Sequence, residues 1–318
     1  MRERPGVGLG LALLSALTFA TSGSFARPLI TGQWSAEAVV LARVGIAALV
    51  LALPALLALR GRWPVLRRNA GTIVVFGLLG VALAQACFFN AVRYLPVGVA
   101  LLLEYLGIVL VVGWMWLVHG QRPRLLTVAG SLTALCGLVF VLDLTGAGRL
   151  DPVGVLWGLG AGVGLAGYYV IAGRVDAALP SVVMASGGMA VGALVLLVLG
   201  VVGALPLRAG TADVAFAGHR MSWLVPIAGL SLIAAVVAYL TGVAGARLLG
   251  ARLSSFVGLT EVMFAVLIAW LVLSELPTAV QLLGGALIVV GVALVRLDEL
   301  RGGRPEPVEE RADEPVLT

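Results

Sequence analysis

Residues 91–141 read AVRYLPVGVALLLEYLGIVLVVGWMWLVHGQRPRLLTVAGSLTALCGLVFV, and residues 245–295 read GARLLGARLSSFVGLTEVMFAVLIAWLVLSELPTAVQLLGGALIVVGVALV. The second stretch repeats the first at an offset of 154 positions. Residues with specific positional roles coincide, which an apolar composition alone does not explain; these pairs are Arg93 and Arg247, Trp116 and Trp270, Pro123 and Pro277, Gly130 and Gly284, and Gly137 and Gly291. The apolar pairs Leu95 and Leu249, and Val112 and Val266, also match but carry less weight. Such a repeat in an apolar chain predicts two homologous halves, an architecture common among membrane transporters.

The composition indicates an integral membrane protein. Hydrophobic residues make up 61% of the chain and charged residues only 12%, whereas a soluble domain carries about 25% charged residues. Apolar stretches of roughly 20 residues recur, each long enough to cross a hydrocarbon core of about 30 Å. These stretches do not alternate apolar and polar residues as barrel strands do. We therefore predict an all-α protein embedded in the lipid bilayer.

The charge pattern does not indicate a nucleic-acid partner. The net charge is +5, and all of the positive charge is arginine. Most arginines fall in short loops, where they set the orientation of a membrane protein. Cys87 and Cys136 fall inside apolar spans, so we interpret them as small hydrophobic residues rather than as a disulfide or metal ligands. No motif in the sequence calls for a metal or a cofactor.

We expect ten transmembrane helices, five in each half, at about 7–27, 38–59, 70–92, 97–118, 125–142, 153–172, 181–205, 223–246, 251–273 and 278–295. The first repeat then covers residues 7–142 and the second repeat residues 153–296. Residues 143–152 form a turn-rich linker, and residues 297–318 form a disordered cytoplasmic tail. A cleavage site at 24–26 would make the first span a signal peptide, but its apolar run is longer than usual and the repeat requires it.

An odd number of spans per half inverts the second half relative to the first. The loop 121–124 is basic, whereas its repeat partner 275–278 begins with Glu275. With the N-terminus inside, the inner face carries the tail arginines together with Arg60, Arg62, Arg67, Arg68, Arg122, Arg124, Arg174, Arg247 and Arg252, whereas only Arg27, Arg93, Arg149, Arg208 and Arg220 lie on or near the outside. We therefore expect a multi-pass protein of the cell (inner or plasma) membrane with both termini in the cytoplasm.

Ten spans in two inverted five-helix repeats resemble the drug/metabolite transporter superfamily, and specifically its EamA-type members. Residues 265–275, AVLIAWLVLSE, look like the end of that family's ninth helix, and Thr260-Glu261-Val262 stands where many members have a glutamate–proline pair. Arg43 occupies the position of an arginine that many members carry in the second helix. Residues 103–107, LEYLG, are similar to the fourth-helix signature of the threonine/homoserine exporter branch. The resemblance covers residues 7–296.

The chain departs from this family at two positions. Members often have proline in the middle of helices four and nine, where this chain has Ile108 and Val262, which pair at the offset of 154. Proline would free a backbone carbonyl group and kink the helix. Without it, we do not expect carbonyl groups at these points to serve as ligands.

Glu261 is a charged residue inside a predicted span, where a charge costs about 2.5–3.5 kcal/mol on insertion scales. It lies about ten residues into its helix, roughly 15 Å deep and close to the midplane. We interpret it as a proton carrier or a ligand for a substrate amine, because a carboxyl group in apolar surroundings binds a proton more readily. The alternative is a protonated carboxyl group in a structural hydrogen bond between helices.

Glu104 and Arg43 each lie about 10 Å below the outer surface by the same helical rise. An arginine at that depth needs a counter-charge or water, so the two residues can pair. A structural ion pair is one interpretation, and a gate or a site for a substrate carboxylate is the other. If they pair, Glu104 stays ionised, and Glu261 is the better proton carrier.

Further side chains inside the spans are candidates for lining a cavity: Gln85, Asn90, Tyr168, Tyr169 and Tyr239. For each of them, a hydrogen bond between helices is the alternative. The two histidines, His119 and His219, fall in loops on opposite sides, and no paired-aspartate motif occurs. These absences disfavour an enzyme of the membrane.

The resemblance implies a secondary-active transporter that exports amino acids or related small metabolites by alternating access. Protons are a candidate coupling ion. No Walker loop is present, so no direct nucleotide drive is visible. Import or facilitated diffusion stays open, since topology does not fix the direction of flux, and a polytopic membrane enzyme is a more distant alternative. The sequence does not name the substrate or decide between a monomer and a homodimer.

Overall fold

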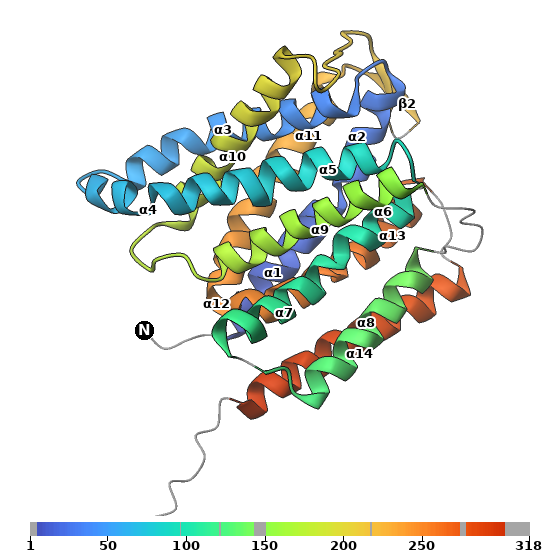
Figure 1. The fold of residues 1–318 in the computed structure, drawn as a ribbon. Coiled ribbons are helices and arrows are strands. Elements are labelled where there is room, and N and C mark those ends of the chain that lie inside the picture. Colours follow the sequence, from blue (N-terminus) through green and yellow to red (C-terminus); the bar gives the residue numbers. More distant parts are fainter. Residues whose placement is uncertain are drawn as a thin grey trace, which may run out of the picture.

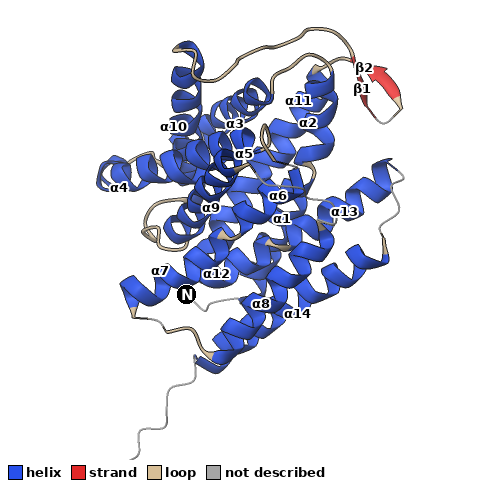
Figure 2. Ribbon diagram, turned by 45° about the vertical axis from the view of Figure 1, so that its right-hand side comes forward, coloured by secondary structure: helices blue, strands red, loops and turns tan. Residues whose placement is uncertain are grey.

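The computed structural model of the chain describes residues 5–95, 97–120, 122–142, 151–216, 218–273 and 278–302. Most of the predicted linker 143–152, Glu275 and residues 303–318 of the predicted tail lie outside the described residues. The described chain is mostly helical and carries a short β-hairpin at one end (Figures 1 and 2).

The first half folds into a series of apolar helices: α1 (Pro5–Ala20), α2 (Ser22–Thr31), α3 (Ala36–Ala58), α4 (Trp63–Phe76), the π-helix η1 (Gly77–Leu83), α5 (Ala84–Ala91), α6 (Val97–Tyr105), α7 (Gly107–His119) and α8 (Leu125–Val141). Local signals explain where some of them begin. The side chain of Ser35 accepts a hydrogen bond from the backbone N–H of Ala38 at 3.2 Å, which caps α3.

The second half repeats this plan: α9 (Pro152–Ala172), α10 (Ser181–Val201), β1 (Val214–Phe216), β2 (His219–Met221), α11 (Leu224–Ser231), the π-helix η2 (Leu232–Val237), α12 (Ala238–Gly258), α13 (Thr260–Leu273) and α14 (Ala279–Gly302). Asp151 caps α9 by accepting from the N–H groups of Val153 and Gly154, at 2.8 and 3.2 Å. Pro152 stands at the first helical position, where its missing N–H costs nothing.

Eight helical segments of the described residues are long and apolar enough to cross a membrane: Gly6–Thr31, Ala36–Ala58, Trp63–Ala91, Val99–His119, Pro152–Ala172, Ser181–Val201, Leu224–Gly258 and Ala279–Asp298. The apolar helix Leu125–Val141 is shorter. Within Leu224–Gly258, the chain leaves helical geometry at Gly250, whose φ is 79°. Glycine adopts this left-handed conformation at no steric cost. This residue divides α12 into two arms, an earlier one ending at Leu249 and a later one starting at Ala251.

Two kinds of interruption recur at equivalent places in the halves. The π-helices η1 and η2 almost coincide when one is shifted by the repeat offset of 154. A turn at Leu106 separates α6 from α7, and a turn at Leu259 separates α12 from α13. The fourth and ninth predicted spans are therefore interrupted, although Ile108 and Val262 stand where many family members have proline.

Helix α14 extends beyond the point at which the sequence predicts the tail to begin. Helix α14 continues past residue 297 to Gly302. Asp298 is only 4% exposed, and its carboxylate accepts a hydrogen bond from the hydroxyl of Thr127 at 2.6 Å. A buried carboxylate with a partner keeps the last turns of the helix in place.

Glycine contacts between α8 and α14 relate the two halves by an approximate two-fold axis. The two helices lie side by side (Figure 1). A β-carbon at Gly130 would lie 2.7 Å from the carbonyl oxygen of Gly291, and one at Gly137 would lie 2.5 Å from that of Gly284. Gly130 and Gly284 are repeat equivalents, as are Gly137 and Gly291. Gly130 thus packs on the equivalent of Gly137, and Gly137 packs on the equivalent of Gly130. This exchange requires α8 and α14 to run antiparallel.

The same two-fold relationship extends through the bundle. Helix α3 packs on α10, its equivalent in the other half. Helix α1 packs on α12 of the second half, and its equivalent α9 packs on α5 of the first half. Gly8 of α1 contacts Leu249, and its equivalent Gly154 of α9 contacts Leu95. Leu249 and Leu95 are themselves equivalent at the offset of 154. The halves therefore interlock as inverted copies.

The bundle has two ends with different loops. At the end that we call the Trp34 face, the indole N–H of Trp34 donates to the carbonyl of Gly210 at 2.6 Å, and the N–H of Ser35 donates to that of Arg208 at 2.9 Å. The β-hairpin lies at this face (Figure 2). At the other end, the Asp176 face, the loop 173–180 between α9 and α10 receives a hydrogen bond from Arg62 to the carbonyl of Ala178 at 3.0 Å.

Candidate functional site

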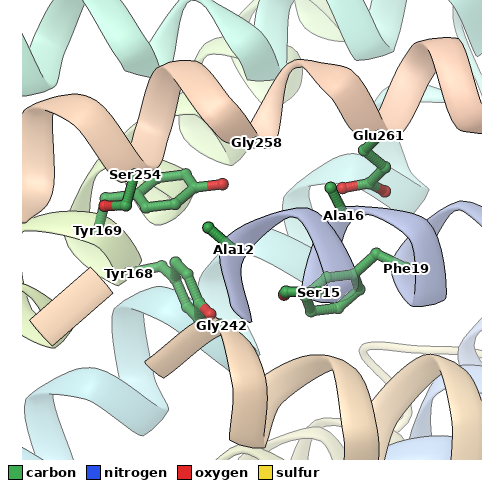
Figure 3. A pocket seen from close by; sticks show the side chains of 10 residues that line it. All are labelled: Ala12, Ser15, Ala16, Phe19, Tyr168, Tyr169, Gly242, Ser254, Gly258 and Glu261. Carbon is green, nitrogen blue, oxygen red and sulfur yellow. The ribbon is translucent and has the colours of Figure 1, made fainter. Parts of the chain in front are cut away.

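A small pocket with a cavity volume of about 20 Å³ lies between the two halves (Figure 3). Its walls come from α1 of the first half and from α9, α12 and α13 of the second half. The lining residues are Ala12, Ser15, Ala16, Phe19, Tyr168, Tyr169, Gly242, Ser254, Gly258 and Glu261. A site at the contact between inverted halves is the usual position for a substrate in transporters built from repeats.

Two glycines make room for tyrosine hydroxyl groups at the pocket. The hydroxyl of Tyr168 lies over Gly242, and the hydroxyl of Tyr169 lies over Gly258. In both cases a β-carbon would overlap the hydroxyl oxygen, so even alanine would displace the ring. Figure 3 shows both tyrosine side chains entering from α9.

Tyr168 presents a buried polar atom without a partner among the described residues. The residue is 6% exposed, and its hydroxyl group forms no hydrogen bond within that part of the chain. Leaving such a group unsatisfied costs about 1–3 kcal/mol, and buried polar groups are normally bonded. The hydroxyl of Tyr168 can therefore bind a ligand that occupies the pocket.

Glu261 places its carboxyl group on the same pocket (Figure 3). It lies in the first turn of α13, just after the interruption at Leu259. The N-terminal end of a helix stabilises negative charge. The hydroxyl of Tyr105 lies within hydrogen-bonding reach of this carboxyl group, and Arg43 and Glu104 are close enough to interact with it electrostatically.

Arg43 and Glu104, which the sequence places at a similar depth, form no salt bridge in the part of the chain that the structure describes. The guanidinium of Arg43 donates from Nη2 to the carbonyl oxygen of Ala234 in η2 at 2.6 Å, while its Nε atom has no hydrogen-bond partner among the described residues. The guanidinium carbon lies 5.5 Å from the ring centroid of Phe19, a distance at which a cation and an aromatic face attract. The partner found for Arg43 is thus a backbone carbonyl of the π-helix. Glu104 lies within electrostatic range but makes no salt bridge to it.

An aromatic cluster surrounds these polar groups. The ring of Tyr168 contacts those of Phe76, Tyr169 and Tyr239, with centroids 5.4, 5.0 and 5.8 Å apart. Phe19 meets Tyr239 edge to face at 5.1 Å. Such contacts fix the ring positions and leave the hydroxyl groups for other partners.

The structure brings most of the residues predicted from the sequence to this region. Glu261, Tyr168 and Tyr169 line the pocket, and the ring of Tyr239 contacts that of Tyr168, with the amide of Gln85 within reach of the Tyr239 hydroxyl. Asn90 is different. Its amide donates to the carbonyl of Ala86 in its own helix at 2.8 Å, and it does not line the pocket.

Ser15 and Ser254 line the pocket but did not stand out in the sequence. Their hydroxyl groups donate to the carbonyls of Ala238 and Gly250, at 2.8 and 2.6 Å. A signal was available, because Ser254, Gly258 and Glu261 follow one another at helical spacing and so share a face.

Metal ligation receives no support from the described ranges, in which no group of three or more histidine, cysteine, aspartate or glutamate side chains could hold an ion. The arrangement instead offers a carboxyl group, a nearby guanidinium and several hydroxyl groups. These groups can bind a small molecule that carries both charges, or can exchange a proton.

Comparison with known proteins places the chain in a family. A solved structure described as "Crystal structure of protein" matches with a TM-score of 0.68 and 23% identity, over 94% of this chain and 98% of that one, and so shares its fold. No curated protein matches. The profile of the EamA-like transporter family matches twice, at residues 6–143 and 152–297. The chain therefore belongs to the EamA-like transporter family, whose members are multi-pass membrane transporters of small molecules.

Proposed function

We propose that this protein is a secondary-active transporter that exports amino acids or related small metabolites by alternating access. The observation that carries the proposal is the carboxyl group of Glu261 in a pocket formed by both halves, beside the unpartnered hydroxyl group of Tyr168. A carboxyl group inside an apolar bundle is costly unless it has a function or a partner.

The site suits a molecule with an amino group and a carboxylate. Glu261 would accept hydrogen bonds from the amino group, and the hydroxyl of Tyr168 would donate or accept one. Arg43 stands close enough to attract the carboxylate, and its Nε–H has no partner in the described part of the chain. Charge-assisted hydrogen bonds of this kind are stronger than those between neutral groups.

Protons are the coupling ion that we propose. In alternating access, the same carboxyl group would bind the substrate in one step and a proton in the other, so that one leaves as the other enters. Glu261 is the best candidate because it lies on the pocket, and Glu104 is the second.

The proposed arrangement in the membrane has ten spans in the inner or plasma membrane, with both termini in the cytoplasm. In this orientation the Asp176 face, with Arg62, Arg68 and Arg247, is cytoplasmic. An excess of arginine on that face supports the assignment. The interrupted α12–α13 segment and the shorter α8 would supply the spans beyond the eight long ones.

Purified protein in liposomes tests the proposal. Pooled labelled amino acids are supplied with and without an imposed pH gradient, and empty liposomes serve as the control. Uptake that follows the gradient supports a proton-coupled amino-acid transporter. Uptake that ignores the gradient points to facilitated diffusion, and the absence of uptake by folded protein contradicts the amino-acid assignment.

A further inference from the structure

Two arginines that are equivalent in the repeat lie at opposite faces of the bundle. Arg93 follows α5 and begins the connection to α6, and Arg247 lies in α12 just before the turn at Gly250. They coincide at the offset of 154. Each arginine therefore lies at the tip of a helical hairpin. The hairpin of the first half consists of α5 and α6, and that of the second half consists of the two arms of α12.

Arg93 ties its hairpin to the start of α3. Its guanidinium forms an ion pair with Glu37, in the first turn of that helix. The side chain of Glu37 is only 6% exposed, while that of Arg93 is 42% exposed. Removing one partner would leave a buried charge uncompensated, so this contact holds the two segments together.

Arg247 ties its hairpin to the start of α10 in the corresponding way. It donates to the carbonyl of Leu179 at 2.7 Å and to the hydroxyl of Ser181 at 2.9 Å, and it also reaches the carbonyls of Asp176 and Ala177. Helices α3 and α10 are repeat equivalents that pack on each other. The two arginines thus make the same connection, one at the Trp34 face and one at the Asp176 face.

Both hairpins are flanked by interruptions of the helix. The α5–α6 hairpin lies between η1 and the turn at Leu106, and the α12 hairpin lies between η2 and the turn at Leu259. A π-helix or a turn breaks the regular hydrogen-bond ladder and is a frequent hinge. Each hairpin can therefore bend as a unit while the rest of the bundle stays in place.

We propose that Arg93 and Arg247 are latches that close the two faces, and that transport requires their alternate release. This inference rests on the proposed transport cycle. When Arg93 separates from Glu37, the α5–α6 hairpin bends away and the pocket opens to the Trp34 face. When Arg247 leaves the loop before α10, the α12 hairpin bends away and the pocket opens to the Asp176 face.

The chemistry of the two latches differs. The Arg93 latch is an ion pair with a single carboxylate, whereas the Arg247 latch has several neutral acceptors. Asp176 holds the acceptor loop in position through its ion pair with Arg68 in α4 and its hydrogen bond with Asn69 at 3.3 Å. The Asp176 face is therefore fastened at two points.

A cysteine in the pocket reports which face is open. Ser254→Cys is made in a background in which Cys87 and Cys136 are replaced by alanine, and a membrane-impermeant thiol reagent is applied to either side in right-side-out or inside-out vesicles. Arg93→Gln is compared with Arg208→Gln, and Arg247→Gln with Arg60→Gln. Both control arginines have exposed side chains on the matching face.

The latches predict opposite effects from equivalent substitutions. Arg93→Gln should speed labelling from the Trp34 face, and Arg247→Gln should speed it from the Asp176 face, each by about 3- to 10-fold for the loss of hydrogen bonds. Equal effects on both faces, or rates equal to those of the controls, would overturn the proposal. If Arg247→Gln does not fold, Ser181→Ala removes a single acceptor and must shift labelling in the same direction.

A double substitution adds an independent check. Glu37→Arg combined with Arg93→Glu restores the ion pair in reversed order, and labelling from the Trp34 face should return toward the original rate. The labelling needs no substrate. Shifted labelling without amino-acid uptake would sustain the latches and contradict the proposed substrate, whereas uptake with unshifted labelling would contradict the latches.

Discussion

Gly137 of α8 and Gly284 of α14 face each other so closely that neither has room for a side chain. A β-carbon at Gly137 would lie 2.5 Å from the carbonyl oxygen of Gly284, and one at Gly284 would lie 2.6 Å from that of Gly137. This contact has its counterpart between Gly130 and Gly291, the repeat equivalents of Gly284 and Gly137. Backbones that approach this closely gain packing and weak hydrogen bonds in a membrane.

Gly284→Ala should therefore destabilise the protein by about 1–3 kcal/mol, because the added methyl group forces the helices apart. Gly285→Ala is the matched control. A β-carbon there meets the methyl group of Met263 at 3.5 Å, which is ordinary contact. The stability of the two variants is compared by their thermal unfolding midpoints in detergent. Equal midpoints for the two variants would show that the helices do not pack through this glycine.

Tyr168→Phe separates a structural role from a ligand role. The hydroxyl group is buried without a partner, so removing it should leave the unfolding midpoint unchanged or raise it slightly. If the hydroxyl binds substrate, KM for the transported molecule should rise about 2- to 10-fold, the worth of a hydrogen bond. Tyr94→Phe, at an exposed position, is the control. An unchanged KM would remove Tyr168 from the binding site.

The loop at the Asp176 face should weaken in acid. The N–H of Ala178 donates to the carboxylate of Asp176, and Arg68 and Asn69 donate as well, which together hold the pKa of Asp176 below its usual value. A carboxylate whose pKa is lower in the folded than in the unfolded protein stabilises the fold at pH values above its unfolded pKa, which is about 3.9 for aspartate. This stabilisation is lost as the pH falls through the pKa of the folded protein.

Asp176→Asn should consequently lower the unfolding midpoint near pH 7, and the difference from the original protein should shrink below about pH 4. Comparing the variant with the original chain at each pH cancels the titration of the other carboxyl groups. A difference that stays constant from pH 7 to the acid limit would contradict a role for the charge of Asp176.

Cysteine labelling tests the orientation in the membrane. Ala212→Cys lies at the Trp34 face and Arg60→Cys at the Asp176 face, and both positions are exposed. In cells that express the alanine background at Cys87 and Cys136, an impermeant maleimide should label Ala212→Cys directly and Arg60→Cys only after permeabilisation. The reverse pattern would invert the proposed topology.

Much of the fold follows from the repeat in the sequence. The matched glycines at 130 and 284, and at 137 and 291, predict equivalent helices, and the structure packs those helices on each other. The interruptions at Leu106 and Leu259 could not be predicted, because no proline marks them. The π-helices depend on tertiary contacts instead, such as the bond from Arg43 to the carbonyl of Ala234.

The candidate site was predictable in its residue types but not in its pairings. Glu261 and the tyrosines at 168 and 169 stood out as polar groups in apolar spans, and they line one pocket. Helical rise predicts a similar depth for Arg43 and Glu104, but depth does not fix the direction in which a side chain points around its helix. In the same way, depth did not show that the amide of Asn90 donates to the carbonyl of Ala86 in its own helix instead of lining the pocket.

The most direct test of the account is the response of Glu261→Gln to a pH gradient in proteoliposomes, measured beside Glu104→Gln. Glutamine keeps the size and hydrogen-bonding capacity of the side chain but cannot carry a proton. We predict that Glu261→Gln loses the gradient-driven part of substrate uptake, while Glu104→Gln retains part of it. Unchanged rate and pH dependence in Glu261→Gln would contradict proton coupling through the pocket.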